Sequence, residues 1–122
     1  MKKFLLSTLL IFPLHAKADW IEYSTAPNGD VYFFDEARVQ KKEHLIQVWN
    51  RVRYKNSVMG ASSYQSLIEI DCAAYSETTL QSTFYTDEKW TVPAMSTDTN
   101  RKPTESINLN TASHRLAAIL CK

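Results

Sequence analysis

The chain has 122 residues, and its 14 Lys and Arg against 13 Asp and Glu give a formal net charge of +1. This balance argues against a nucleic-acid-binding protein, which needs a basic surface to neutralise phosphates. The length suits one domain, and a domain of this size is only marginally stable unless something reinforces its core.

The first 18 residues have the pattern of a secretory signal peptide. Two lysines follow Met1, an apolar run extends from Phe4 to Leu14, and alanines occupy positions 16 and 18. The run is shorter than the roughly 20 residues that cross a bilayer. We therefore expect cleavage between Ala18 and Asp19 rather than a transmembrane anchor. Cleavage would remove three lysines and no acid, which leaves eleven basic and thirteen acidic residues, a net charge of −2.

The expected destination is the periplasm or the cell surface. No cysteine lies near the cleavage position, so the sequence does not predict a lipoprotein. No later segment is apolar enough to form a stable membrane span. Residues 19–122 are expected to form the exported domain.

Two strands joined by a tight turn are predicted first. They are "WIEYST" (residues 20–25) and "VYFF" (31–34), and the Asn28-Gly29 pair between them is a strong hairpin signal because both residues tolerate positive φ. Asp35 should then cap a single helical turn through residue 39, since its carboxylate can accept from the next backbone amides. Residues 41–44 resemble a polar turn.

The longest predicted strand covers residues 45–54. One face carries Ile46, Val48, Val52 and Tyr54, with Asn50 as the exception, and is expected to face the core. Leu45, Gln47, Trp49, Arg51 and Arg53 fall on the opposite face. Residues 55–62 are expected to form a loop.

The next strand ends at Cys72, which its alternation with Tyr64, Ile68 and Ile70 directs inward. Residues 77–86 predict a fifth strand, and residues 89–93 a short sixth one. The polar residues 94–106 are expected to form a loop.

The last segment changes period, because Ala112, Leu116, Ile119 and Leu120 fall on one helical stripe, and Asn110 or Thr111 can cap it. The predicted fold is therefore α+β: an antiparallel sheet of five to six strands with one C-terminal helix packed on a face.

The two cysteines, Cys72 and Cys121, predict one structural disulfide, since thiols of exported proteins usually pair. Such a bond would close a loop of about 50 residues and stabilise the fold by roughly 3–4 kcal/mol in the chain-entropy account. The alternative is a redox-active or metal-binding pair. It has no C-x-x-C motif to favour it, although His114 lies seven residues before Cys121.

Catalytic chemistry has little support in the sequence. Neither a nucleophile elbow nor a glycine-rich phosphate loop is present, and residues 19–122 contain two histidines, His44 and His114. The adjacent Asp35 and Glu36 fit a helix cap with a solvated neighbour better than an acid/base pair. We expect no enzyme activity, no cofactor and no metal site.

The candidate ligand-binding residues are Trp49, Arg51 and Arg53 on the polar face of the long strand, with Lys55 just beyond. Tryptophan and arginine are enriched at binding hot spots, so this row predicts a surface for a protein ligand. The alternative is a solvated face whose charges discourage edge-to-edge pairing, and the two interpretations stay open at this point.

The order of these features resembles the surface-adhesin protein E family of small exported Gram-negative domains. The resemblance covers essentially all of residues 19–122 and is carried by "VYFFDEARV", "FYTDEKW", "YQSLIEIDCAAY" and the closing "LNTASHRLAAILC". It implies a small antiparallel sheet with one helix and a Cys72–Cys121 disulfide, and it allows a homodimer formed through the sheet.

The resemblance also implies a function. The family's named member is a surface adhesin that captures host extracellular-matrix and serum proteins, and its adhesin-type members are membrane-anchored lipoproteins. The expected function is thus an adhesin-like, non-catalytic module that binds protein ligands. The alternative is a soluble periplasmic accessory protein with an envelope partner and no role in host adhesion, because the signal lacks a lipidation cysteine.

Overall fold

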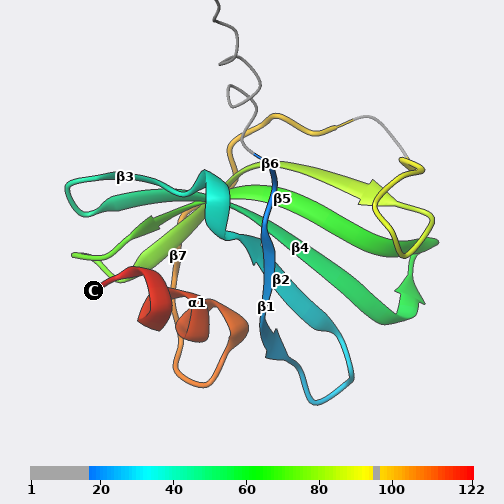
Figure 1. Cartoon of the computed structure of the whole chain (residues 1–122), viewed down its shortest axis with the longest axis horizontal. Coiled ribbons are helices and arrows are strands. Elements are labelled where there is room, and N and C mark those ends of the chain that lie inside the picture. Colours follow the sequence, from blue (N-terminus) through cyan, green and yellow to red (C-terminus); the bar gives the residue numbers. More distant parts are fainter. Residues whose placement is uncertain (1–16, 95–96) are drawn as a thin grey trace, which may run out of the picture.

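The computed structural model describes residues 17–94 and 97–122, which form one antiparallel sheet and one α-helix (Figure 1). The elements in chain order are β1 (Trp20–Thr25), β2 (Val31–Asp35), the 3-10 turn η3 (Glu36–Arg38), β3 (Gln40–Lys42), β4 (Leu45–Val58), β5 (Ala61–Asp71), β6 (Ser76–Tyr85), β7 (Glu105–Ser106) and α1 (Ala112–Leu120). The predicted α+β class is confirmed.

The strands are ordered β1-β2-β4-β5-β6-β7, and β3 pairs with β4 beside β2. Two of these strands are short and were not predicted: β3 lies where a polar turn was expected, and β7 lies within the expected loop 94–106. Residues 89–93 form only an isolated bridge, between Pro93 and Tyr85, so the predicted sixth strand there is wrong. Short strands carry too few residues for alternation to reveal them.

The β1–β2 and β4–β5 hairpin turns each use a glycine in the left-handed region. Gly29 has φ +96° and donates to the carbonyl of Ala26 at 2.9 Å, as the Asn-Gly signal predicted. Gly60, with φ +87°, makes the turn between β4 and β5. The predicted loop 55–62 is wrong, since β4 runs to Val58 and β5 begins at Ala61, and these two residues pair across the turn. Pairing is irregular between Arg53 and Val58 and residues 55–58 are exposed, so this part of β4 lacks the alternation that reveals a strand.

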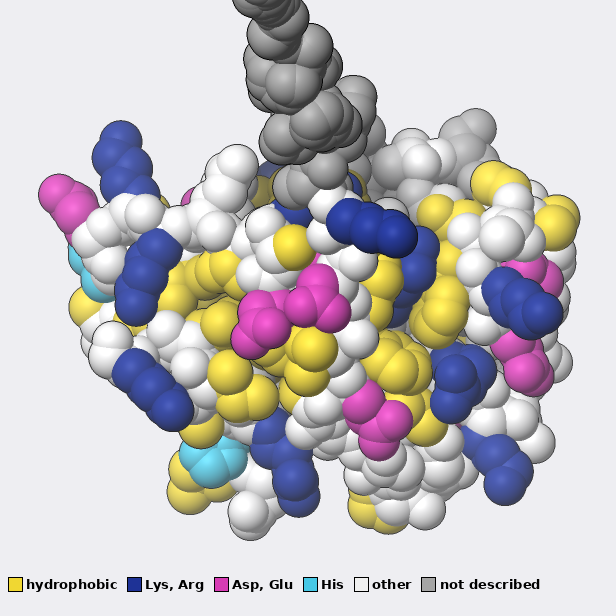
Figure 2. All heavy atoms as spheres, in the orientation of Figure 1, with side chains coloured by type: hydrophobic (Ala, Val, Ile, Leu, Met, Phe, Trp, Pro, Cys, Tyr) yellow, Lys and Arg dark blue, Asp and Glu magenta, His cyan; other side chains and the backbone are white. Residues whose placement is uncertain are grey.

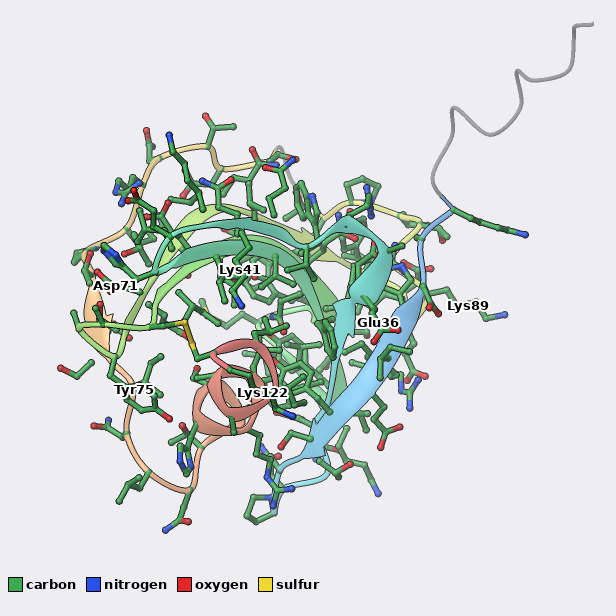
Figure 3. The ribbon with its side chains drawn as sticks, turned by 60° about the vertical axis from the view of Figure 1, so that its left-hand side comes forward. Glu36, Lys41, Asp71, Tyr75, Lys89 and Lys122 are labelled. Carbon is green, nitrogen blue, oxygen red and sulfur yellow. A yellow bond between two sulfur atoms is a disulfide. The ribbon has the colours of Figure 1, made fainter. Side chains whose placement is uncertain are left out.

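The sheet curves over α1, and the core fills the space between them (Figure 3). Ile46 and Val48 of β4 and Ile70 of β5 are fully buried against Leu116 and Ala117 of α1. We call this side the concave face and the opposite side the outer face. The inward face predicted for β4 and β5 is therefore confirmed.

The helix begins after Thr111, whose hydroxyl accepts from the His114 amide at 3.1 Å. Its buried stripe differs from the predicted one: Ala117 is fully buried, whereas Ile119 is 42% exposed. A nine-residue helix touches the sheet along a narrow line, so a small rotation exchanges one apolar position for its neighbour.

The predicted disulfide joins Cys72, just after β5, to Cys121, the C-cap of α1. The two residues are 49 positions apart, and their Cα atoms are separated by 5.6 Å. Figure 3 shows the sulfur–sulfur bond between the end of the curved sheet and the helix. Because it closes a long loop, it anchors the helix against the concave face.

Most of the predicted signal peptide, residues 1–16, lies outside the described residues, so its cleavage stays a prediction. Next to the expected cleavage position, the backbone N–H of Asp19 donates to the buried Asp35 carboxylate at 2.9 Å. Burial alone would raise the pKa of Asp35, but N–H groups of Asp19 and Ala37 and the guanidinium of Arg38 outweigh it and lower the pKa. No helix in the described part of the chain is long and apolar enough to cross a membrane.

Candidate binding surface on the outer face of the sheet

The outer face carries the aromatic and cationic side chains of the middle strands. Along β4 the buried residues Val48, Asn50 and Val52 alternate with half-buried Trp49, Arg51 and Arg53. The alternation follows from the pleat, which directs successive side chains to opposite sides. Trp49, Arg51 and Arg53 are the residues of β4 that the sequence predicted for ligand binding. In the structure each of them contacts a different aromatic or cationic side chain.

Arg51 lies between two indole rings. Its guanidinium carbon is 4.1 Å from the centroid of Trp20 and 4.7 Å from that of Trp90, and its Nε donates to Gln65 at 2.7 Å. Burial lowers the pKa of Arg51 from its ordinary value, yet a guanidinium stays charged at neutral pH. The stack combines cation–π attraction with a hydrogen bond, so Arg51 is held in one position.

Sequence reasoning did not place Trp20 and Trp90 at this site, because they come from β1 and from the turn after β6. That turn is held by Asp87, whose carboxylate accepts from the amides of Thr91 and Val92 at 3.1 and 3.0 Å. A further bond from the Thr91 hydroxyl helps to lower the pKa of Asp87 to about 2. The Trp90 indole N–H then donates to the Tyr64 carbonyl at 3.0 Å.

Arg53 and Lys55 extend the row toward the hairpin ends. The guanidinium of Arg53 lies 5.4 Å from the ring centroid of Phe33, which in turn meets Trp90 edge-on at 5.7 Å. Lys55 is exposed, and its backbone amide donates to Asp30 at 3.0 Å. Its aliphatic stem lies against Gly29, so the stem packs while the ammonium stays at the surface.

Trp49 lies apart from the arginine stack, in a groove. A cavity of about 390 Å³ is lined by Trp49 and Leu67 together with residues of η3 and β3, and the Arg38 guanidinium lies 6.0 Å from the indole. A second cavity of about 400 Å³ continues along β3 past Lys42, and the two cavities share Gln40 and Gln47. The outer face therefore offers an open groove with an aromatic wall and basic residues along one side.

The charges around this surface are mixed. Glu69, which lines the second cavity, accepts from Gln47 at 3.2 Å and pairs with Arg101 at 3.1 Å. Figure 2, in which β1 and α1 lie in front, shows that basic, acidic and hydrophobic side chains are interspersed on that side of the molecule as well. A ligand on the outer face would meet separate arginine and lysine side chains rather than one continuous basic field.

The residues considered for catalysis do not gather into one site. Asp35 is used by the η3 turn, His44 lies 3.9 Å from Asp71, and His114 accepts from the Asn110 amide. Figure 3 shows Asp71 and Glu36 at opposite sides of the ribbon. Among residues 17–94 and 97–122, no group of three His, Cys, Asp or Glu side chains could hold a metal ion.

Comparison with known proteins identifies a matching family and solved structures with a similar fold. The profile of the family described as surface-adhesin protein E matches residues 20–122. The structure of Haemophilus influenzae protein E is 18% identical with a TM-score of 0.65, over 92% of this chain and 90% of that one. Its crystal form II is also 18% identical, with a TM-score of 0.63 over 94% and 96% of the two chains. No curated protein sequence matches this chain.

Proposed function

This chain belongs to the surface-adhesin protein E family, and we propose that it acts as an adhesin-like, non-catalytic module that binds a protein ligand through the outer face of its sheet. The ligand class that the family suggests is a host extracellular-matrix or serum protein. The binding residues are Trp49, Arg51, Arg53 and Lys55, and binding requires no cofactor.

The observation that carries the proposal is the groove around Trp49. An indole that is half-buried at the wall of an open groove can bury further apolar area against a partner. Arg38 lies over the same ring, and Lys42 lies further along the groove, whereas the Lys41 ammonium donates to the Leu120 carbonyl of α1 at 3.5 Å. Tryptophan and arginine that become desolvated together are the usual centre of a binding hot spot. The basic side chains favour an acidic segment of the ligand.

Arg51 contributes to the same surface by fixing its shape. Arg51 is held between Trp20 and Trp90, so it keeps the outer face rigid rather than adapting to a ligand. Trp49 meets one guanidinium, that of Arg38, and Arg53 lies over one ring, that of Phe33, so both side chains can reorganise on binding. We therefore expect Trp49 and Arg53 to contribute the most to affinity.

A direct binding measurement tests this proposal. Trp49→Ala and Arg53→Ala variants are compared with wild type on immobilised extracellular-matrix and serum proteins by surface plasmon resonance. Loss of a hot-spot residue should weaken binding by roughly 30-fold, or about 2 kcal/mol. Arg115→Ala, which removes an exposed cation from α1, is the matched control and should leave affinity unchanged. Wild-type affinity in both outer-face variants would refute the proposed site.

Location separates a host ligand from an envelope partner. Protease treatment of intact cells digests a surface-displayed protein and spares a periplasmic one. Digestion agrees with capture of host proteins. Protection, together with release by osmotic shock, favours the alternative of a soluble periplasmic accessory protein.

A further inference from the structure

The concave face contains a separate pocket that the outer-face function does not use. It has a volume of about 220 Å³ and lies between the sheet and the first residues of α1. Four tyrosines from four different strands line it: Tyr23, Tyr32, Tyr54 and Tyr64. A pocket of this size admits one small functional group rather than a drug-sized molecule.

Hydrogen-bond acceptors gather at the base of this tyrosine pocket. The Tyr23 hydroxyl donates to the Asn50 side-chain carbonyl at 2.5 Å, and the Asn50 amide donates to the Ser66 hydroxyl at 3.4 Å. The first bond uses the one donor of the Tyr23 hydroxyl, the second uses one of the two amide N–H donors of Asn50, and lone pairs remain on both oxygens. The base is therefore suited to a ligand that donates hydrogen bonds.

Glu77 of β6 supplies the only charged side chain among the residues that line the pocket. Its Oε1 atom is buried and has no hydrogen-bond partner within the described residues. Burial and the neighbouring Glu105 raise the pKa of Glu77, while a hydrogen bond from Ser113 lowers it. Ser113 lies in the first turn of α1, where backbone N–H groups favour an ionised carboxylate.

Burying the Glu77 Oε1 atom without a hydrogen-bond donor costs folding free energy. This unpaired acceptor therefore indicates that a donor from a ligand would be favourable in the pocket.

The tyrosine walls add a second preference for positive charge. Burial raises the pKa of Tyr23 and Tyr32, and that of Tyr54 to about 12, so these phenols stay neutral at physiological pH. Neutral aromatic rings attract cations through the negative potential of their faces. A neutral wall and one carboxylate together favour a cation and disfavour an anion.

Two irregularities of strand pairing bring the key groups into this pocket. Tyr23 is the extra residue of a bulge in β1, between the pairs Glu22–Phe33 and Ser24–Tyr32. A second shift in β6 leaves Glu77 opposite Ile70, whose side chain points into the core. Bulges re-aim side chains and are common next to functional sites.

We propose that the tyrosine pocket binds the ammonium group of a primary amine, with the Glu77 carboxylate as the charged acceptor, Tyr23 and Asn50 as neutral acceptors, and tyrosine rings around the cation. An ammonium carries three donors, which matches these acceptors in number and type. The amine is either a small free amine or a lysine side chain of a protein.

Titration with cadaverine, followed by amide chemical shifts of the folded protein, tests this proposal. Cadaverine should perturb residues around Tyr54, Glu77 and Ser113, and 1-pentanol, which has a similar chain and no charge, should not. Glu77→Gln should weaken cadaverine binding at least about tenfold, because a charge-assisted hydrogen bond is lost. Glu22→Gln, an equal charge change at an exposed position of β1, is the control and should bind as wild type.

Several results would overturn the proposal. Equal binding of pentanol and cadaverine would show a merely apolar pocket, and binding of glucose without cadaverine would show a polyol site. No shift at millimolar cadaverine, or shifts confined to the outer face, would also refute it. A melting curve of Glu77→Gln checks that any loss of binding does not reflect unfolding.

A second titration distinguishes the two sources of the amine. A short peptide with one central lysine is compared with cadaverine and with the same peptide carrying norleucine. Tighter binding of the lysine peptide indicates a protein ligand, and tighter binding of cadaverine indicates a free amine. The norleucine peptide should not bind in either case. This site lies on the opposite face from Trp49, so its failure would leave the outer-face proposal unaffected.

Discussion

The concave face buries aliphatic side chains of β4 and β5 against α1, whereas the outer face leaves its aromatic side chains half-buried beneath arginines. The same strands supply both faces, and adjacent residues of β4 show the difference. Asn50 is buried and bonded to Tyr23, while Arg51 stacks between indoles at the surface. Stability should therefore depend mainly on the concave face, and recognition of a protein ligand on the outer one.

Among the variants considered, loss of the disulfide should lower the free energy of unfolding the most, because it acts on the concave face. Cys72→Ser frees the end of α1 from the concave face, and we expect a loss of about 3–4 kcal/mol of unfolding free energy. The melting temperature should then fall by roughly 15 °C. Thermal unfolding measured by circular dichroism checks this, with Ala73→Ser as a control at an exposed neighbouring position. An unchanged melting temperature would show that the cross-link does not stabilise this face.

Truncation of a buried side chain in α1 should give the second-largest loss of unfolding free energy. Leu116→Ala removes a fully buried side chain and should cost about 3 kcal/mol, because it leaves a cavity under the sheet. Ile119→Ala, at a position 42% exposed, should cost well under half of that. Urea denaturation of the two variants compares them directly. Equal losses would favour the helical stripe predicted from the sequence over the one seen in the structure.

The outer face should contribute less to stability. Arg51→Ala removes contacts with Trp20 and Trp90 and the bond to Gln65, and we expect a loss of about 1–2 kcal/mol. Arg53→Ala, which removes one contact with Phe33, should cost less than about 1 kcal/mol. The midpoint of urea unfolding measures both. A larger loss for Arg51 than for Leu116 would reverse the proposed division between the faces.

The smallest expected change in unfolding free energy comes from Glu77, a carboxylate on the concave face, and depends on pH. Because the pKa of Glu77 is raised in the folded protein, its protonated form is favoured there. That stabilisation is present below the ordinary pKa of 4.5 and is lost as pH rises through the folded-state value. Glu77→Gln should therefore be more stable than wild type at pH 7, by roughly 0.5 kcal/mol. The advantage should vanish at low pH, and a constant advantage would contradict an ionised Glu77.

Much of the fold could be predicted because long elements repeat their pattern. The alternation around Ile46 and Val48 predicted β4, the Asn28-Gly29 pair predicted the first hairpin turn, and the two cysteines predicted the disulfide. The failures concern segments without repetition. Strands β3 and β7 have three and two residues, and their neighbours in the sheet, rather than their own sequence, form them.

The candidate sites were predicted less completely. Trp49, Arg51 and Arg53 were nominated because they alternate on one strand, and they do share the outer face. Trp20 and Trp90, which enclose Arg51, come from distant segments and carry no local signal. Glu77 could not be placed either, since one extra residue in β6 changes which side chains point inward.

The sequence by itself determined the central parts of the long strands, the terminal helix and the one cross-link that two cysteines can form. These features depend on local pattern and on residue type, both of which are readable along the chain. Only the tertiary structure decided which aromatic rings enclose Arg51 and which polar groups meet in the tyrosine pocket. Both arrangements depend on strand register and bulges, which follow from pairing between segments far apart in the sequence.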